Sequence, residues 1–187
     1  MTDKKRCKWC NPQNPLYVEY HDNEWCRANF DEQYLYEMLI LESFQAGLSW
    51  ECVLNKRESF RAAYDNFDVD RVAAYDEGKI DELMQDKGII RNRLKIRASI
   101  NNSRIFKDIT KEHGSFGAYL KCFTRGVCVY ETGKTTNALS DEISKDLQRR
   151  GMKFVGSVII YSYLQAIGVI YSHDKECYLY QGESKNV

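Results

Sequence analysis

A single acidic side chain interrupts an otherwise apolar helix face in the segment 31–46. Asp31 can cap a helix over this segment, and such a helix would place Glu42 on a stripe of apolar side chains. Those side chains are Leu35, Met38, Leu39 and Ala46. A carboxylate on such a stripe is costly unless a specific partner meets it, and perturbed carboxylates concentrate at functional sites. Glu42 is therefore a candidate catalytic or binding group; the alternative is that it bends to the surface.

The residues after this helix predict a sharp junction. Gly47 can end the first helix, Ser49 can cap a second one, and Trp50 begins it. Trp50 either lines a site together with Glu42 or packs in the core.

Cysteine and histidine side chains lie near both ends of the chain. Cys7, Cys10 and His21 come first, and His173 and Cys177 follow near the other end at i, i+4 spacing. Four nitrogen and sulfur donors in a tetrahedral array are what Zn²⁺ prefers, and a closed shell of this kind is structural. Cys7 and Cys10 share Cys-x-x-Cys spacing, so Cys10 either competes with Cys7 for a place or lies beside the site as a bystander. The sequence has no His-Glu-x-x-His motif, which disfavours catalytic zinc.

Positive charge concentrates in the segment 87–97, although the chain carries 27 basic and 27 acidic residues and no net charge. The basic residues there are Lys87, Arg91, Arg93, Lys95 and Arg97. A turn containing Gly88 between two helices can aim backbone N–H groups at one anion, and the local charge suits a DNA phosphate. The alternative is a solvated basic helix face.

Aromatic residues gather in the first 50 positions. They could line a slot for a flipped nucleobase: Trp9, Tyr17, Tyr20, Trp25 and Trp50. For Tyr17 and Trp25 the alternative is packing around the metal site.

The elements that must position these residues are helices. The 187 residues suit one domain, 43% of them are apolar, and both prolines precede residue 16. Helical spacing and capping residues, with Asp68 and Ser140 as N-caps, predict an all-α fold. The predicted helices cover 31–46, 50–65, 69–75, 79–85, 92–111, 116–122, a segment from Ser140 to Gly151, and 156–171. The segment 125–137 is predicted as a loop with a short strand near residues 127–130.

The cysteine content and the apolar segments bear on location. Seven cysteines and an N-terminus without an apolar signal region predict a reducing, cytoplasmic setting. The most apolar segment, 154–171, is interrupted by polar residues and glycines, so it predicts a buried helix and no membrane span.

Several motifs in consistent order resemble the bacterial 3-methyladenine DNA glycosylase I family. They run from Cys7-x-Trp9 through Tyr20-His21-Asp22-Asn23-Glu24-Trp25, Gln45-Ala46-Gly47-Leu48-Ser49-Trp50, Gly88-Ile89-Ile90-Arg91 and Lys153-Phe154-Val155-Gly156 to His173-x-x-x-Cys177. The resemblance implies a helix-hairpin-helix DNA glycosylase whose termini are joined by a structural zinc site. We expect a single compact unit over 1–187, with a helix-hairpin-helix core at 31–150 and a zinc-bound subdomain from 1–30 and 151–187.

The resemblance also implies roles for individual residues. The zinc ligands would be Cys7, His21, His173 and Cys177. Glu42 would be the catalytic group and would read the polar edge of the base with Tyr20, while Trp50, Trp9 and Trp25 would form the aromatic walls. The DNA-binding residues would be Gly47 and Leu48, where the duplex is wedged open, and Gly88, Arg91, Arg93 and Lys95 around the hairpin. In this sequence Cys26 stands where the family usually has Gly, and Leu94 replaces a small residue.

The implied reaction suits these residue types. A 3-methylated adenine in double-stranded DNA is cationic and leaves easily as the free neutral base, so an ionised Glu42 could select it over ordinary adenine. No lysine stands at the expected pocket positions, so we expect a monofunctional enzyme without lyase activity, acting as a monomer. Two other classes are a non-catalytic protein that binds alkylated DNA and a zinc hydrolase of small molecules. The four-ligand set disfavours the hydrolase, and the sequence does not decide against the binding protein.

Overall fold

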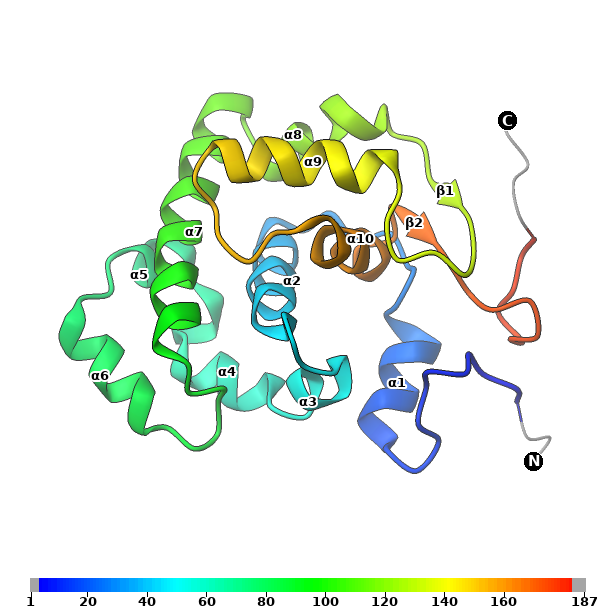
Figure 1. Cartoon of the computed structure of the whole chain (residues 1–187), viewed down its shortest axis with the longest axis horizontal. Coiled ribbons are helices and arrows are strands. Elements are labelled where there is room, and N and C mark those ends of the chain that lie inside the picture. The colour runs from blue at the N-terminus through cyan, green and yellow to red at the C-terminus, as the bar shows by residue number, and fades with distance from the viewer. Residues whose placement is uncertain (1–3, 183–187) are drawn as a thin grey trace.

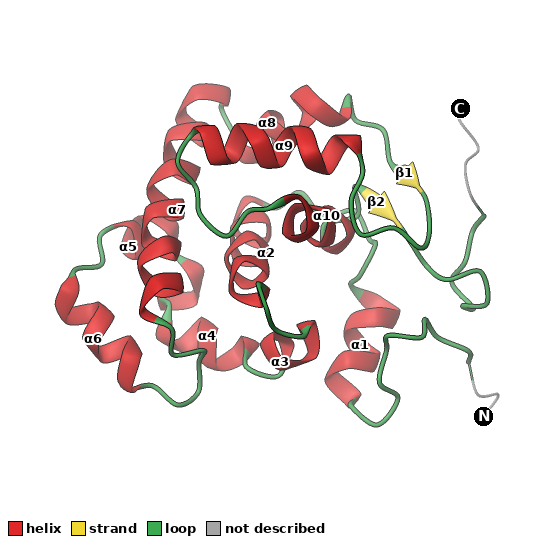
Figure 2. Cartoon of the chain, viewed as in Figure 1, coloured by secondary structure: helices red, strands yellow, loops and turns green. Residues whose placement is uncertain are grey.

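The computed structural model describes residues 4–182, and this part of the chain is mostly helical (Figures 1 and 2). The elements in chain order are α1 (Pro15–Asn23), α2 (Glu32–Gln45), α3 (Trp50–Leu54), α4 (Arg57–Ala63), the short turn η1 (Asp65–Phe67), α5 (Val69–Ala73), α6 (Glu77–Gln85), α7 (Arg93–His113), α8 (Phe116–Thr124), β1 (Val129–Tyr130), α9 (Ala138–Arg149), α10 (Ser157–Ala166) and β2 (Ile170–Tyr171). No helix among residues 4–182 is long and apolar enough to cross a bilayer.

Helix α2 occupies the centre of the molecule, where α7, α8 and α10 pack against it (Figure 1). It begins as predicted, because the Asp31 carboxylate accepts the backbone N–H of Tyr34 at 3.0 Å. Every residue from Leu35 to Phe44 is buried. The sequence predicted one buried stripe, but neighbouring helices cover α2 on all sides. Any charged group in this stretch therefore needs a partner inside the protein.

Two predicted helices differ from those observed. The segment 50–65 divides into α3, which ends at Leu54 with Asn55 as its C-cap, and α4, after which the backbone from Asp65 to Phe67 turns left-handed. The predicted helix over 156–171 ends at Ala166. Gly168 then adopts a φ of 75°, and a side chain there would collide with the backbone of Ala28. The chain continues into β2, which pairs in parallel with β1.

The predictions from the sequence placed the start of α9 wrongly and did not include α1. Asn137, not Ser140, caps α9: its side chain accepts the N–H of Ser140, whose hydroxyl accepts the N–H of Asn137 in return. Helix α1 was not predicted, although Asn14 caps it and Pro15 occupies its first position. The remaining predicted helices are confirmed to within a few residues of their ends, and part of the predicted strand is β1.

The two ends of the described chain lie side by side next to α1 (Figure 1). The backbone N–H of Tyr178 donates to the carbonyl of Lys5 at 2.8 Å. This contact brings the N-terminal cysteine segment against the segment that follows β2.

Candidate functional site

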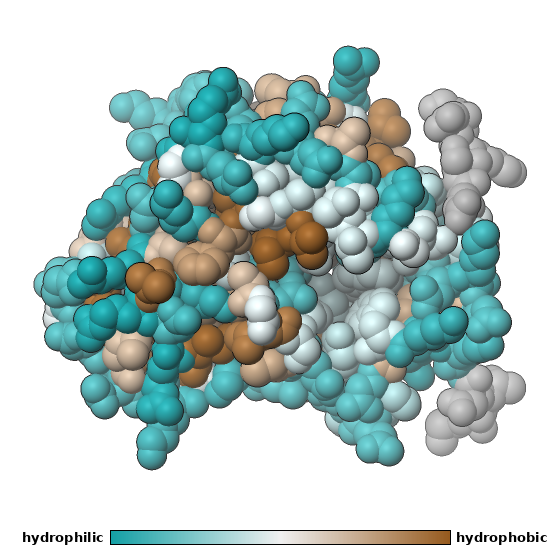
Figure 3. Space-filling view, in the orientation of Figure 1, coloured by the Kyte–Doolittle hydropathy of each residue, from teal (hydrophilic) through white to brown (hydrophobic). Residues whose placement is uncertain are grey.

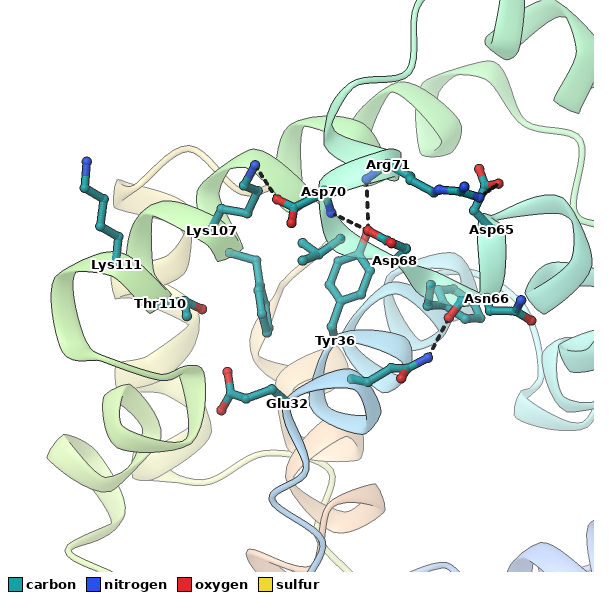
Figure 4. Close-up of a pocket in the computed structure, with 14 residues that line it drawn as sticks. Glu32, Tyr36, Asp65, Asn66, Asp68, Asp70, Arg71, Lys107, Thr110 and Lys111 are labelled. Atoms are coloured by element: carbon teal, nitrogen blue, oxygen red, sulfur yellow. Dashed lines mark hydrogen bonds and ion pairs between the residues drawn. The ribbon is translucent and has the colours of Figure 1, made fainter.

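Two cavities in the described part of the chain differ in whether the acidic side chains at their walls have hydrogen-bond or ion-pair partners. The larger, of about 780 Å³, lies between α2, α5, α7 and η1 (Figure 4). Its carboxylates already serve the fold: Asp68 accepts two N–H groups of α5, and Asp70 pairs with Lys107 at 2.6 Å. Glu32 accepts the N–H groups at the start of α8. These carboxylates therefore stabilise the fold, and Thr110 Oγ1 is a buried hydroxyl at this cavity without a hydrogen-bond partner among residues 4–182.

The smaller cavity, of about 340 Å³, opens between α1, α3 and α10, where the surface is hollowed (Figure 3). Three polar atoms at its wall are buried without a hydrogen-bond partner among residues 4–182: Glu42 Oε2, Gln45 Oε1 and Trp50 Nε1. Buried polar atoms are nearly always paired in folded proteins. A wall that gathers two acceptors and one donor without partners is suited to a polar ligand.

Glu42 is the most unusual of these groups, with 2% of its surface exposed. Burial alone raises the pKa of its carboxyl well above the usual 4.5, because no basic group compensates for the lost solvation. From the sequence, Glu42 is expected to be ionised. In the free protein the structure instead favours the neutral carboxylic acid, and a cation entering the cavity would favour ionisation.

Aromatic rings form the other walls of this cavity. Tyr20 and Trp50 lie with ring centroids 5.4 Å apart, and burial raises the pKa of Tyr20. Trp9 packs edge-on against Trp25 at 4.7 Å. The structure thus brings the five residues predicted to read the base, Glu42 included, around one space.

Tyr17, which the sequence offered either as a slot residue or as packing around the metal site, is joined at this cavity by residues that the sequence did not indicate. Tyr17 lines it and packs against Trp9 at 5.1 Å. Ser162 and Gln165 reach it from α10, and Lys134 from the loop after β1. A signal for the α10 residues was present, since both are polar and three residues apart in the most apolar segment of the chain.

Beside the aromatic wall lies a buried cluster of four potential metal ligands: Cys7, His21, His173 and Cys177. Their ligand atoms all lie within 4.8 Å of one another. The Cys177 sulfur is 3.4 Å from His21 Nε2 and 3.5 Å from His173 Nδ1, and the Cys7 sulfur is also 3.5 Å from His173 Nδ1. Zinc–ligand bonds of about 2.3 Å to sulfur and about 2.0 Å to nitrogen in a tetrahedron give sulfur–nitrogen separations of about 3.5 Å. The cluster fits such an ion.

Neighbouring groups fix the orientation of this cluster. The carboxylate of Asp22 lies 2.8 Å from His21 Nδ1, which turns Nε2 toward the centre. Burial and the nearby His21 lower the pKa of His173 to about 4, so its imidazole stays neutral, as a metal ligand must be. Cys10 does not belong to the cluster, because its sulfur faces the carbonyl of Tyr17 at 3.7 Å. The structure therefore favours Cys7 over Cys10, the alternative that spacing left open.

Comparisons with known proteins give the family of this chain. The sequence model of the methyladenine glycosylase family matches residues 9–180. DNA-3-methyladenine glycosylase 1 of Escherichia coli (strain K12) is 43% identical over 185 residues, which cover 95% of this chain and 98% of that protein. The chain belongs to the methyladenine glycosylase family. The resemblance seen in the sequence is confirmed.

Solved structures of this family share the fold. A crystal structure of 3-methyladenine DNA glycosylase I matches with a TM-score of 0.89 and 41% identity, covering 94% of this chain and 99% of that one. A substituted form of 3-methyladenine DNA glycosylase I, solved in complex with 3-methyladenine, also gives a TM-score of 0.89, with 30% identity and coverage of 96% and 99%.

The predicted DNA-binding residues of this methyladenine glycosylase fall into three environments. Gly47, with a φ of 77°, and Leu48, which is 42% exposed, form the turn between α2 and α3. Arg91 is exposed on the turn between α6 and α7, whereas Arg93 is paired with Asp81 of α6 at 2.5 Å. Gly88 donates its N–H to Asp86, and a side chain there would meet Ser59 at 2.9 Å. Lys95 does not share this exposure, because its ammonium points into the protein.

Two departures from the family pattern have clear structural settings. Cys26 adopts a φ of 61°, the left-handed conformation that glycine takes most easily. Its sulfur accepts the backbone N–H of Ser172 at 3.3 Å, so the turn is kept and the thiol is buried. Leu94 is 73% exposed at the start of α7, beside the turn that carries Arg91.

Proposed function

We propose that this chain excises 3-methyladenine from alkylated double-stranded DNA and leaves an abasic site. One observation carries the proposal: a fully buried carboxyl, Glu42, faces an aromatic cavity and has no cationic partner. A cationic base supplies the missing charge. The E. coli relative bears the name DNA-3-methyladenine glycosylase 1, and a similar solved protein was captured with 3-methyladenine, which supports the same ligand class here.

Selection in this proposal follows from charge and shape. A flipped 3-methyladenine carries a positive charge that Glu42 can balance and a flat ring that Trp50 and Tyr20 can contact. Each cation–aromatic or stacking contact contributes about 1–3 kcal/mol. Ordinary adenine is neutral, so it leaves Glu42 uncompensated and binds less well.

Base flipping costs a few kcal/mol of lost stacking, which contacts to DNA must offset. Leu48 is exposed on a tight turn close to the cavity wall, so we assign it the wedge that fills the space left by the base, with Gly47 allowing the turn. We propose that α6, residues 86–92 and α7 form a helix-hairpin-helix that grips a phosphate, with Arg91 as its exposed charge. We also propose that residues 31–150 form the helix-hairpin-helix core, and that 1–30 and 151–187 together form the zinc-bound subdomain.

The reaction breaks the bond between the base nitrogen and the sugar carbon. The bonding electrons leave with the base, which departs neutral, and water adds to the sugar carbon and releases a proton. Lys134 lies at the cavity, but its ammonium is paired with Glu131 at 2.7 Å. The ion pair holds the Lys134 nitrogen on Glu131, so we keep the proposal of a monofunctional enzyme without a covalent lysine intermediate.

We further propose that Cys7, His21, His173 and Cys177 hold a structural Zn²⁺ ion. When bound, the ion would supply a cross-link between the two ends of the chain. The rings of Trp25 and His173 lie 4.8 Å apart, and those of Trp9 and His21 5.3 Å apart. The ligand set therefore supports the aromatic wall of the cavity.

A base-release assay on methylated DNA tests the proposed function. We expect free 3-methyladenine to appear with the purified chain and no strand cleavage or borohydride-trapped adduct to accompany it. A protein that bound the same DNA tightly but released no base would be the non-catalytic binder instead. A trapped adduct would contradict the monofunctional mechanism.

A further inference from the structure

Lys95 is buried although it follows the exposed turn between α6 and α7. Only 7% of its surface is exposed, and its Nζ donates to the carbonyls of Phe44 at 2.8 Å and Ala46 at 2.5 Å. These partners are carbonyls, not carboxylates. A buried ammonium without a counter-charge is a poor source of stability compared with an apolar side chain of similar size. Its position calls for a functional reason.

The two carbonyls belong to the last turn of α2. The final carbonyls of a helix have no partner within it, and a cation there also complements the helix dipole. The intervening carbonyl, of Gln45, accepts the N–H of Leu48 at 2.6 Å. Lys95 and Leu48 together therefore fix the end of the helix that carries Glu42 and Gln45, at the point where the wedge turn leaves it.

Lys95 is also anchored at its other end. Its backbone N–H donates to the Asn92 side chain, which caps α7 and closes the turn 86–92. The ring of Phe154, from the segment between α9 and α10, lies 5.9 Å from Nζ. One residue thus connects the turn that carries Arg91 with the end of α2.

We propose that Lys95 is a positioning residue that joins the phosphate-gripping turn to the wedge turn, so that contact with DNA at the first sets the depth of the second. The inference rests on the proposed function. Lys95 touches neither DNA phosphate nor base in this role. It acts by holding Leu48 in register with the turn at 86–92.

Lys95→Met tests this role, with Lys111→Met as the matched control, since Lys111 is an exposed lysine at the far end of the same helix. We expect Lys95→Met to slow single-turnover base release by about 10²-fold, the scale of a misplacement of about 1 Å. Binding of free 3-methyladenine, followed by tryptophan fluorescence, should change less than about twofold, and the control should match wild type in both. Base release within about threefold of wild type would overturn the proposal.

The salt dependence of DNA binding separates positioning from direct contact. A lysine that binds a phosphate contributes about 0.9 to the slope of log affinity against log salt. We expect the slope of Lys95→Met to equal that of wild type. A slope smaller by about one contact would show that Lys95 reaches the DNA itself and would overturn the proposal.

Two measurements identify the route of the effect. In a double-mutant cycle with Leu48→Ala, the two losses should be strongly non-additive, because Lys95 acts through the wedge turn; additive losses would contradict the inference. Hydrogen exchange without DNA should quicken at residues 44–49 in Lys95→Met, and unchanged exchange there would also overturn it. If Lys95→Met does not fold, Lys95→Gln, which keeps a donor, takes its place. Should wild-type protein release no base, the proposed function fails, while hydrogen exchange still tests the connection.

Discussion

Two buried glutamates on α2 show how one helix can serve both the fold and the site. Glu37 and Glu42 are 6% and 2% exposed. The carboxylate of Glu37 accepts Nε of Arg57 at 2.6 Å and also pairs with Arg61 at 2.8 Å. Glu42 has no such partner, and burial raises its pKa. Glu37 is structural because arginines compensate its charge. Glu42, in the same helix, has no such partner and is available to a ligand.

The surroundings of Glu37 extend this contrast. Arg57 also binds Glu24 at 2.7 Å, so the ion pairs tie α4 to both α2 and the segment after α1. Glu24 belongs to the same stretch as Tyr20 and Trp25. Through Arg57 and Glu24, Glu37 therefore helps to hold the aromatic wall that faces Glu42.

Glu42→Gln is the change with the largest expected effect. The amide keeps the shape of the side chain and cannot become an anion, so base release should fall by about 10²–10³-fold, or roughly 3–4 kcal/mol in the barrier. The melting temperature should not fall. Release within about threefold of wild type would show that Glu42 does not select the cation.

Glu37→Gln is the matched substitution at the paired position. It leaves Arg57 and Arg61 with weakened partners in a buried setting, and because Glu24 remains we expect a loss of about 3 kcal/mol in the free energy of unfolding. Base release per folded molecule should stay near wild type. If activity falls while denaturant unfolding is unchanged, the division between the two glutamates is wrong.

Cys177→Ser removes support from the aromatic side of the Glu42 cavity without touching Glu37. If the loss of one thiolate weakens zinc affinity about 100-fold, stability falls by about 2.7 kcal/mol at a fixed metal concentration. Metal analysis and thermal unfolding would check this, with Cys10→Ser as the control, since Cys10 lies outside the cluster. Equal metal content in wild type and Cys177→Ser would contradict the zinc site.

The pH dependence of stability is the most specific test of the comparison. The pKa of Glu42 in the folded state lies above the usual 4.5. At pH values between 4.5 and the folded-state pKa, the unfolded chain therefore binds fewer protons than the folded one. The free energy of unfolding therefore falls as pH rises through this interval, by up to about 1.4 kcal/mol per pH unit. Glu42→Gln should lack this component. The difference between the two proteins should be absent below about pH 4 and grow above it; a constant difference would mean that Glu42 is not desolvated.

Local signals in the sequence account for most of the fold. Asp31, Asp68 and Gly47 mark helix ends that the structure confirms, because capping and left-handed termination depend on neighbouring residues only. The break within 50–65 and the early end of α10 could not be predicted in the same way. The early end of α10 depends on the close approach of Gly168 to Ala28, a contact of the assembled chain, and the break at Asn55 and Lys56 carries no side-chain cap that the sequence could signal.

The candidate site divides in a similar manner. Motif order and residue type were enough to select Glu42, the aromatic residues and the four potential zinc ligands, since each stands out against its own neighbours or in a family pattern. Only the tertiary structure decided which cysteine joins the cluster, which basic side chains are exposed and whether Glu42 is charged. Burial, hydrogen-bond partners and distances between segments far apart in the chain set these properties. Glu42 lies in a helix that is covered on every side, and no basic group in the described protein compensates for the burial of its carboxyl.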